Sequence, residues 1–163
     1  MRKKVWNELA QIRHSLEYLA LFLDVQKSRK KWFNILTVIF STGGVMGWKM
    51  WEYAPAVACA IIAVIHLFKL LENQVMLSDE KFEKLSELRT KHLEYSNDLE
   101  KLWFEFENGC KDEVELRNTY FELRKEHYTK IQKMDDALNI PNKDGELIKR
   151  SDILATNYLE KHF

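Results

Sequence analysis

Cysteine, proline and glycine are scarce in this sequence of 163 residues, which contains two, two and five of them. Cys59 lies in an apolar run and Cys110 in a polar stretch, so we predict neither a disulfide framework nor a metal site, and a reducing compartment fits this usage. Sequence repeats, low-complexity tracts and the polar–apolar alternation typical of β-strands are also lacking. These absences, together with the amphipathic segments described below, predict an all-α protein.

Motifs that carry catalytic chemistry are missing as well. The sequence has no H-E-x-x-H, no P-loop, no G-x-G-x-x-G and no nucleophile elbow. Its many carboxylates are typical of solvated helix faces, with i, i+4 pairs such as Glu87–Lys91. We therefore predict that the protein is not an enzyme and carries no cofactor or metal ion. Five residues of the C-terminal part would either line a ligand pocket between helices or place polar tips along a packed seam: His92, His127, Tyr95, Tyr120 and Tyr128.

The formal net charge of zero conceals segments of opposite charge. Residues 1–31 contain eight Lys and Arg against three Asp and Glu, a net charge of +5, whereas residues 72–163 contain fifteen against twenty-one, a net charge of −6. The acidic C-terminal part argues against general nucleic-acid binding, which requires a basic face. A basic segment directly before an apolar one suits the surface of an anionic membrane leaflet.

The apolar runs 32–51 and 53–71 predict a transmembrane hairpin over residues 32–71, between an N-terminal amphipathic cytoplasmic helix (1–31) and a cytoplasmic helical domain (72–163). Each run is slightly shorter than the roughly 20 residues that usually span a bilayer. Lys49 and Lys69 at the run ends extend the spans by snorkelling. Aromatic residues mark both interfaces, as membrane proteins favour: Trp32, Phe33, Phe68, Trp48, Trp51 and Tyr53.

The orientation of the hairpin follows from its flanking charges. Lys27, Arg29, Lys30, Lys31 and Lys69 flank its terminal side, whereas the tip carries a single lysine. The positive-inside rule then places both termini in the cytoplasm. The basic first residues resemble the start of a signal peptide, but charged residues interrupt any hydrophobic core after them, so we expect no cleaved signal. A soluble helical bundle that buries 32–71 is the competing interpretation, because both runs are short.

Apolar residues at intervals of three and four predict amphipathic helices over 5–31 and 72–108, with heptad seams typical of coiled coils. The first helix ends in the basic cluster, and Ser78 to Glu80 offer a fresh helix start in the second. Asn108-Gly109 is a stop signal, a third helix covers 112–138, and Ser151 caps a short final helix to about Phe163. The seams are Val5, Leu9, Ile12, Leu16, Leu19 and Leu23, and then Phe82, Leu85, Leu88, His92, Tyr95, Leu99, Leu102 and Phe106.

Small residues in the hairpin predict close contacts between helices. Gly43 and Gly47 form a G-x-x-x-G in the first span, and Ala56, Ala60 and Ala63 match them in the second. These faces join either the two helices of one hairpin or the hairpins of several chains.

A weakly polar stripe also follows the first span, where Asn34, Thr37, Ser41 and Gly44 are spaced by three, four and three residues. It would line a pore in an assembly of several chains, although hydroxyls in membrane helices more often bond to carbonyls of their own helix. His66, near the cytoplasmic end of the second span, is an ionisable residue at membrane depth and joins this set of candidates.

Within this arrangement, Trp32 precedes the first span, and Leu88-Arg89-Thr90-Lys91-His92 is followed by Tyr95 and Leu99. The order of amphipathic helix, basic cluster, short hairpin and long helical region resembles the SLATT family, two-transmembrane effector domains found beside nucleotide-second-messenger enzymes in bacterial conflict systems. The resemblance covers most of the chain by architecture. It implies a bacterial antiviral effector that oligomerises and breaches the inner membrane when a nucleotide signal changes, with no catalytic residues.

We therefore expect a homo-oligomeric effector of antiphage defence whose residues 32–71 permeabilise or disrupt the bacterial inner membrane under control of a nucleotide second messenger. The seams in 5–23 and 82–106 would supply the assembly surfaces. Lys143, Lys149 and Arg150 are the nearest candidates for an anionic ligand. The alternative is a membrane-anchored helical scaffold or interaction protein that forms no pore.

Overall fold

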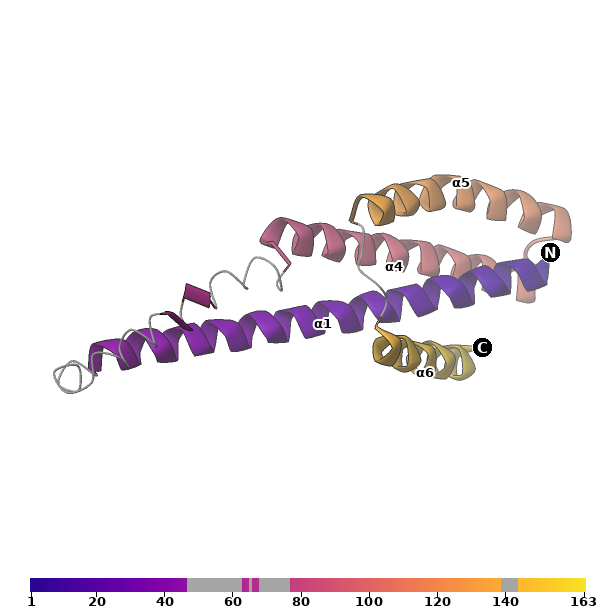
Figure 1. The fold of residues 1–163 in the computed structure, drawn as a ribbon. Coiled ribbons are helices and arrows are strands. Elements are labelled where there is room, and N and C mark those ends of the chain that lie inside the picture. Colours follow the sequence, from indigo (N-terminus) through magenta and orange to yellow (C-terminus); the bar gives the residue numbers. More distant parts are fainter. Residues whose placement is uncertain (47–62, 65, 68–76, 139–143) are drawn as a thin grey trace. The chain divides into compact units, whose positions relative to one another are not determined.

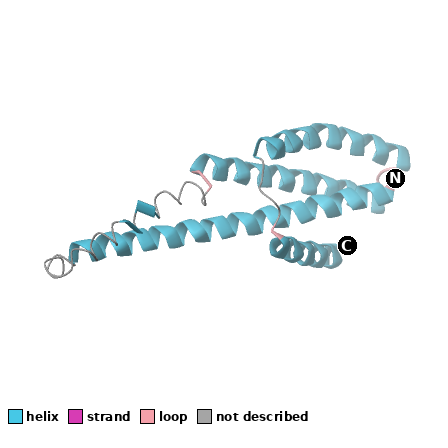
Figure 2. Ribbon diagram, in the orientation of Figure 1, coloured by secondary structure: helices cyan, strands magenta, loops and turns pink. Residues whose placement is uncertain are grey.

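Four long helices make up almost all of the residues that the structure describes (Figure 1). The computed structural model describes residues 1–46, 63–64, 66–67, 77–138 and 144–163. The described residues contain no strand (Figure 2), which confirms the predicted all-α class. The helices are α1 (Arg2–Met46), α4 (Asp79–Glu107), α5 (Glu113–Leu138) and α6 (Gly145–His162).

The chain divides into two compact units. Residues 1–23 and 81–163 form one unit, which we call the helical body. Residues 24–80 form the other, which we call the central unit. By these bounds, α1 contributes its first part to the helical body and its remainder to the central unit.

The core of the helical body is built from the apolar seams that the sequence predicts. α1, α4 and α5 contribute buried side chains at intervals of mostly three and four residues, which place them on one side of each helix. Full burial of one large apolar side chain stabilises a fold by roughly 1.5–3 kcal/mol. The buried members are Val5, Leu9, Ile12, Leu19, Leu23, Leu85, Leu88, Tyr95, Leu99, Leu102, Leu116, Tyr120 and Ile131.

The seams of residues 5–23 and 82–106 meet within one chain. The prediction that they join separate chains is wrong, because the same side chains already lie in one common core. A heptad pattern specifies that a helix needs an apolar partner, but not whether that partner comes from the same chain. Here α4 and α5 supply it, so the seams leave no apolar stripe for a second copy.

α1 continues through the basic cluster at which the sequence predicts its end. Residues 27–31 are helical, and the helix runs on to Met46. No glycine or proline occurs from Arg2 to Thr42, so nothing in this stretch interrupts the i to i−4 hydrogen bonds. The predicted boundary at Lys31 is therefore wrong. The change from charged to apolar side chains changes the environment in which the helix is stable, but it does not interrupt the hydrogen bonding of the backbone.

The stop signal at Asn108-Gly109 is confirmed. α4 ends at Glu107, and Gly109 has a φ of 70°. The amide of Gly109 donates to the carbonyl of Phe106 at 3.0 Å, and the next amide donates five residues back at 2.8 Å, the pattern of a Schellman motif. α4 begins at Asp79, beside the predicted start signal, and residues 72–76 lie outside the described residues.

α6 begins earlier than the sequence predicts. Its N-cap is Asp144, whose carboxylate accepts a hydrogen bond from the amide of Glu146 at 2.9 Å. The prediction that Ser151 caps the helix is wrong. Ser151 is buried inside α6, where its hydroxyl donates to the carbonyl of Ile148 at 2.8 Å. From the sequence alone, a serine whose hydroxyl bonds to a carbonyl of its own helix cannot be distinguished from a serine that caps a helix.

Gly109→Ala tests the turn between α4 and α5. A methyl group at Gly109 would meet nothing within 4 Å, so its cost is the left-handed backbone alone. We expect the free energy of unfolding in urea to fall by about 1–2 kcal/mol. Gly145→Ala is the matched control, because that position is equally open and lies in a right-handed helix, and it should cause no loss. Equal effects at the two positions would contradict the role assigned to Gly109.

Candidate functional site

The described part of the central unit presents large apolar side chains to solvent along one side of α1. Their spacing of three and four residues places them on the same side of the helix. Two residues of the second apolar run, Val64 and Leu67, are also exposed, by 38 and 58%. Exposed apolar surface of this kind is typical of a contact with a membrane or a protein. The exposed side chains of α1 are Trp32 (66%), Ile35 (38%), Val38 (63%) and Ile39 (58%).

The described residues of the predicted polar stripe differ in their exposure to solvent. Asn34 is exposed, whereas Thr37 is half-buried. The Thr37 hydroxyl donates to the carbonyl of Phe33 at 2.9 Å, which satisfies it within its own helix. Ser41 and Gly44 belong to α1, and their surroundings lie outside the described part of the chain.

The predicted helix-packing residues fall mostly outside the described residues. Gly47, Ala56 and Ala60 lie there, while Gly43 is part of α1 and Ala63 is an exposed helical residue. The predicted second span over 53–71 is described only at residues 63–64 and 66–67, where His66 is helical and exposed. Within the described residues, no helix combines the length and the apolar content that crossing a membrane requires.

Basic side chains surround α1 just before its exposed apolar side. Lys27, Arg29, Lys30 and Lys31 are all exposed. The Lys30 ammonium forms an ion pair with the carboxylate of Asp79, the first residue of α4. We call these four residues the basic collar. Positive charge therefore lies immediately next to apolar surface in the central unit.

The described candidates for an anionic ligand, Lys149 and Arg150, form no built site with other described residues. Lys149 and Arg150 are exposed in the first half of α6, and Lys143 lies outside the described residues. The start of a helix favours an anion, but the carboxylate of Asp144 already accepts from the Glu146 amide there. The first turn of α6 therefore supplies its own anion.

Glu8 of α1 lies at a polar cluster inside the helical body. The Tyr95 hydroxyl donates to its Oε1 at 3.3 Å, and the Tyr120 hydroxyl donates to its Oε2 at 3.2 Å. The Arg124 guanidinium lies 3.8 Å from the same carboxylate. Burial, reinforced by the Glu8 charge, raises the pKa of both tyrosines, so their hydroxyls stay protonated as donors. Side chains of α1, α4 and α5 thus meet at one carboxylate.

Arg13 anchors a second cluster on α1, between α4 and α6. Its guanidinium carbon lies 3.3 Å from the ring centroid of Tyr158, a cation–π contact. One of its nitrogens lies 3.9 Å from Glu100, whose carboxylate also accepts from the Tyr158 hydroxyl at 3.1 Å. Near it, the His14 ring nitrogen lies 3.0 Å from the hydroxyl of the buried Ser151. These contacts hold α6 against α1 and α4.

Two further histidines of the helical body, His92 and His127, behave as seam residues with polar tips. His127 stacks on Tyr95, with 5.2 Å between ring centroids, and its Nε2 lies 3.0 Å from the Asp98 carboxylate. His92 is buried, with Nδ1 3.0 Å from the carbonyl of Leu88. Burial lowers the pKa of His92, because the charged ring loses its hydration. Of the two interpretations offered for these side chains, the packed seam fits these contacts.

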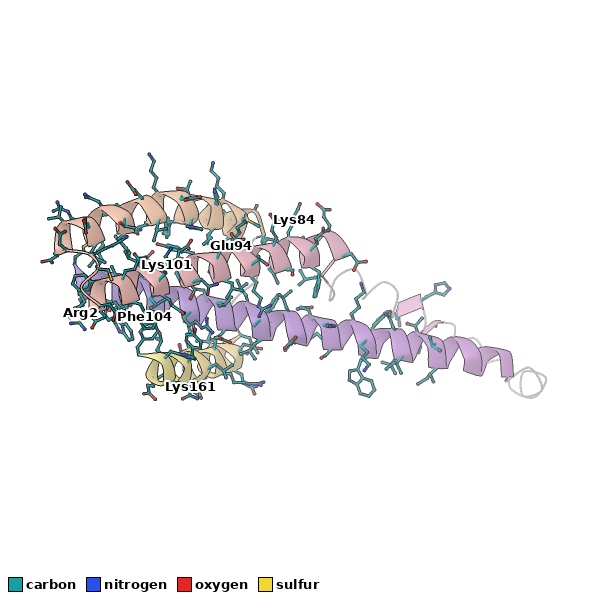
Figure 3. The ribbon with its side chains drawn as sticks, turned by 180° about the vertical axis from the view of Figure 1, so that it is seen from behind. Arg2, Lys84, Glu94, Lys101, Phe104 and Lys161 are labelled. Atoms are coloured by element: carbon teal, nitrogen blue, oxygen red, sulfur yellow. The ribbon has the colours of Figure 1, made fainter. Side chains whose placement is uncertain are left out.

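An open groove of about 750 Å³ lies at one end of the helical body, between α1, α4 and α6. Aromatic rings line it, and the centroids of Trp6 and Trp103 are 5.1 Å apart. Arg2 lies over the Trp103 ring at 5.2 Å and forms an ion pair with Glu107 at 2.5 Å. Figure 3 labels Arg2 and Phe104, which come from α1 and α4 and lie close together here. The guanidinium therefore already covers part of the aromatic surface.

Comparisons of the chain with protein-family models, with curated proteins and with solved structures find no match.

The clusters around Glu8 and Arg13 were not predicted from the sequence. A signal for them exists, because Glu8 and Arg13 stand directly beside the seam residues Leu9 and Ile12. Charged side chains that flank an apolar seam commonly pair across a helix interface. The identity of their partners depends on which helices pack together, and the pattern does not carry that information.

Glu8→Leu tests the first cluster. The substitution leaves two buried hydroxyls and one guanidinium without their acceptor, so we expect a loss of about 2–4 kcal/mol in the free energy of unfolding. The triple variant Glu8→Leu, Tyr95→Phe, Tyr120→Phe removes the orphaned hydroxyls and should recover part of that loss. Glu122→Ala, at an exposed position of α5, is the control and should have little effect. No recovery in the triple variant would contradict the hydrogen-bonded cluster.

The buried His92 predicts a pH dependence of stability. Its pKa in the folded protein is lower than the ordinary value of 6.5, so the unfolded chain binds the proton first as the pH falls. The free energy of unfolding should therefore decrease as the pH is lowered through 6.5 towards the pKa of the folded state. In His92→Leu this decrease should be smaller when urea unfolding is followed at several pH values. An unchanged decrease would show that His92 is not held neutral by burial.

Proposed function

We propose that this protein is a membrane effector whose residues 32–71 insert into a bacterial inner membrane, self-associate and permeabilise it. The observation that carries the proposal is the exposed apolar side of α1, which follows directly after the exposed basic collar. Along the helix the order is positive charge, then Trp32, then aliphatic side chains. A helix that leaves the cytoplasm meets headgroups, interface and hydrocarbon in this order.

The free energy of solvation favours this assignment. Trp32, Val38 and Ile39 each expose more than half of their surface to water. Complete transfer of one such side chain to apolar surroundings is favourable by roughly 1.5–3 kcal/mol. A bilayer around this side of α1 would therefore stabilise the central unit by a few times that amount. The collar sets the orientation, because the positive-inside rule keeps it, and with it both termini, in the cytoplasm.

Self-association in this proposal uses the hairpin. The heptad seams are unavailable, since the helical body buries them within one chain. Small residues then allow close approach of helices in lipid, where apolar surface alone gives no drive for association. The packing positions are Gly43, Gly47, Ala56, Ala60 and Ala63, and those that would border a pore are Asn34, Thr37, Ser41, Gly44 and His66.

The resemblance to the SLATT family supplies the biological setting of the proposal, antiphage defence under a nucleotide second messenger. α1 contributes residues to both units, so a ligand that alters the packing of the helical body acts on the helix that also carries the exposed apolar side. Such a ligand would shift a two-state equilibrium by the difference in its affinity for the two states. Lys143, Lys149 and Arg150 are the nearest candidates for its anionic groups.

Val38→Asp tests the membrane proposal. A carboxylate near the middle of a spanning helix costs about 2.5–3.5 kcal/mol, so we expect the variant to be released by alkaline carbonate and to cause less dye leakage from liposomes. Wild-type protein should resist carbonate and cause leakage. Phe121→Asp is the control, because Phe121 is exposed on α5 of the helical body and should leave both readouts unchanged.

The outcomes separate the alternatives. Release of the wild-type protein by carbonate would end the membrane proposal in favour of a soluble bundle. Retention without leakage, in the presence or absence of nucleotides, would favour the membrane-anchored scaffold.

A further inference from the structure

The members of the basic collar differ in what they contact. Lys27, Arg29 and Lys31 are exposed, and among the described residues none of them has an ion pair. Lys30 is half exposed, and its ammonium is paired with Asp79, which is 86% exposed. Within the described part of the chain, the collar therefore holds three cations without an ion pair and one cation that a carboxylate of the same unit already neutralises.

The helical geometry spreads these cations around α1. Successive residues of an α-helix are rotated by about 100°, so Lys27 and Lys31 share one side, while Arg29 and Lys30 lie on others. Lys31 heads the side on which Ile35 and Val38 are exposed. A ring of cations at the base of an apolar helix side matches a layer of anionic headgroups rather than a single bound anion.

We propose that the basic collar binds the anionic headgroups of a phospholipid bilayer, and that Asp79 competes with those headgroups for Lys30. The inference rests on the proposed insertion of residues 32–71 and adds the lipid class that the collar recognises. Near a charged membrane each exposed basic side chain strengthens binding by about fivefold. A cation that is paired with a carboxylate of its own chain gains less, because the pair as a whole carries no net charge. Anionic lipid would thus free Asp79 at the start of α4.

The test compares substitutions that each remove one positive charge from the collar. The full chain is synthesised in the presence of vesicles of phosphatidylcholine alone, or of phosphatidylcholine mixed with phosphatidylglycerol, and the partition coefficient is measured by flotation. Lys27→Gln, Arg29→Gln and Lys31→Gln should each lower the partition coefficient onto anionic vesicles by about fivefold. Lys30→Gln should lower it much less, because Asp79 already occupies that side chain.

Asp79→Asn provides the opposite change. It should raise partitioning onto anionic vesicles by about fivefold by releasing Lys30, and the effect should vanish in the double variant Lys30→Gln, Asp79→Asn. Glu83→Gln is the matched control, since it removes one exposed carboxylate from α4 without touching the collar. Circular dichroism of each variant checks that the helices remain.

The results separate the inference from the proposal on which it rests. Equal partitioning onto neutral and anionic vesicles would overturn the headgroup site and leave membrane insertion intact. Absence of partitioning onto either kind of vesicle would overturn both. Equal losses at Lys30 and Lys31 would overturn the competition by Asp79, and so would an Asp79→Asn variant that behaves like Glu83→Gln.

Discussion

The unbroken hydrogen bonding of α1 is the constraint on which the rest of the structure depends. Forty-five residues form one helix, and its side chains change character twice along that length while the backbone does not. The first part supplies a seam to the core of the helical body, the next turns carry the basic collar, and the last part carries exposed apolar residues. The absence of glycine and proline up to Thr42 makes this continuity possible, because every interior residue keeps its hydrogen bond.

The helical body combines an apolar core with carboxylates at its edge. Glu8 receives two tyrosine hydroxyls, and Glu100 receives one tyrosine hydroxyl and lies near a guanidinium. Apolar contacts alone tolerate sliding of one helix along another, since leucines are interchangeable at successive turns. A carboxylate with donors from two other helices does not, because a shift of one turn would bury it without partners. These clusters therefore fix the register in which α4, α5 and α6 pack against α1.

Sequence reasoning predicted the elements of the body better than their pairing. The seam from Val5 to Leu23 identified core residues correctly, because a repeat of three and four depends only on helical geometry. The stop at Gly109 was found for a similar reason, since few residues other than glycine adopt its positive φ. The partner of the seam and the cap of α6 depend on tertiary contacts. The hydroxyl of Ser151 bonds inside its helix and meets His14, which lies far away in the sequence.

The basic N-terminal segment also shows that the sequence pattern does not identify the partners of a side chain. Its net charge of +5 suggests a single membrane-facing feature, but its cations serve two purposes. Arg2 and Arg13 lie against aromatic rings and near the carboxylates of Glu107 and Glu100, so they neutralise part of the acidic C-terminal region within the body. Residues 27–31 retain exposed charge, next to the apolar side of α1. The net charge of the segment does not distinguish the cations that pair within the body from those that stay exposed. The contacts of each cation in the structure decide which ones remain available for a membrane.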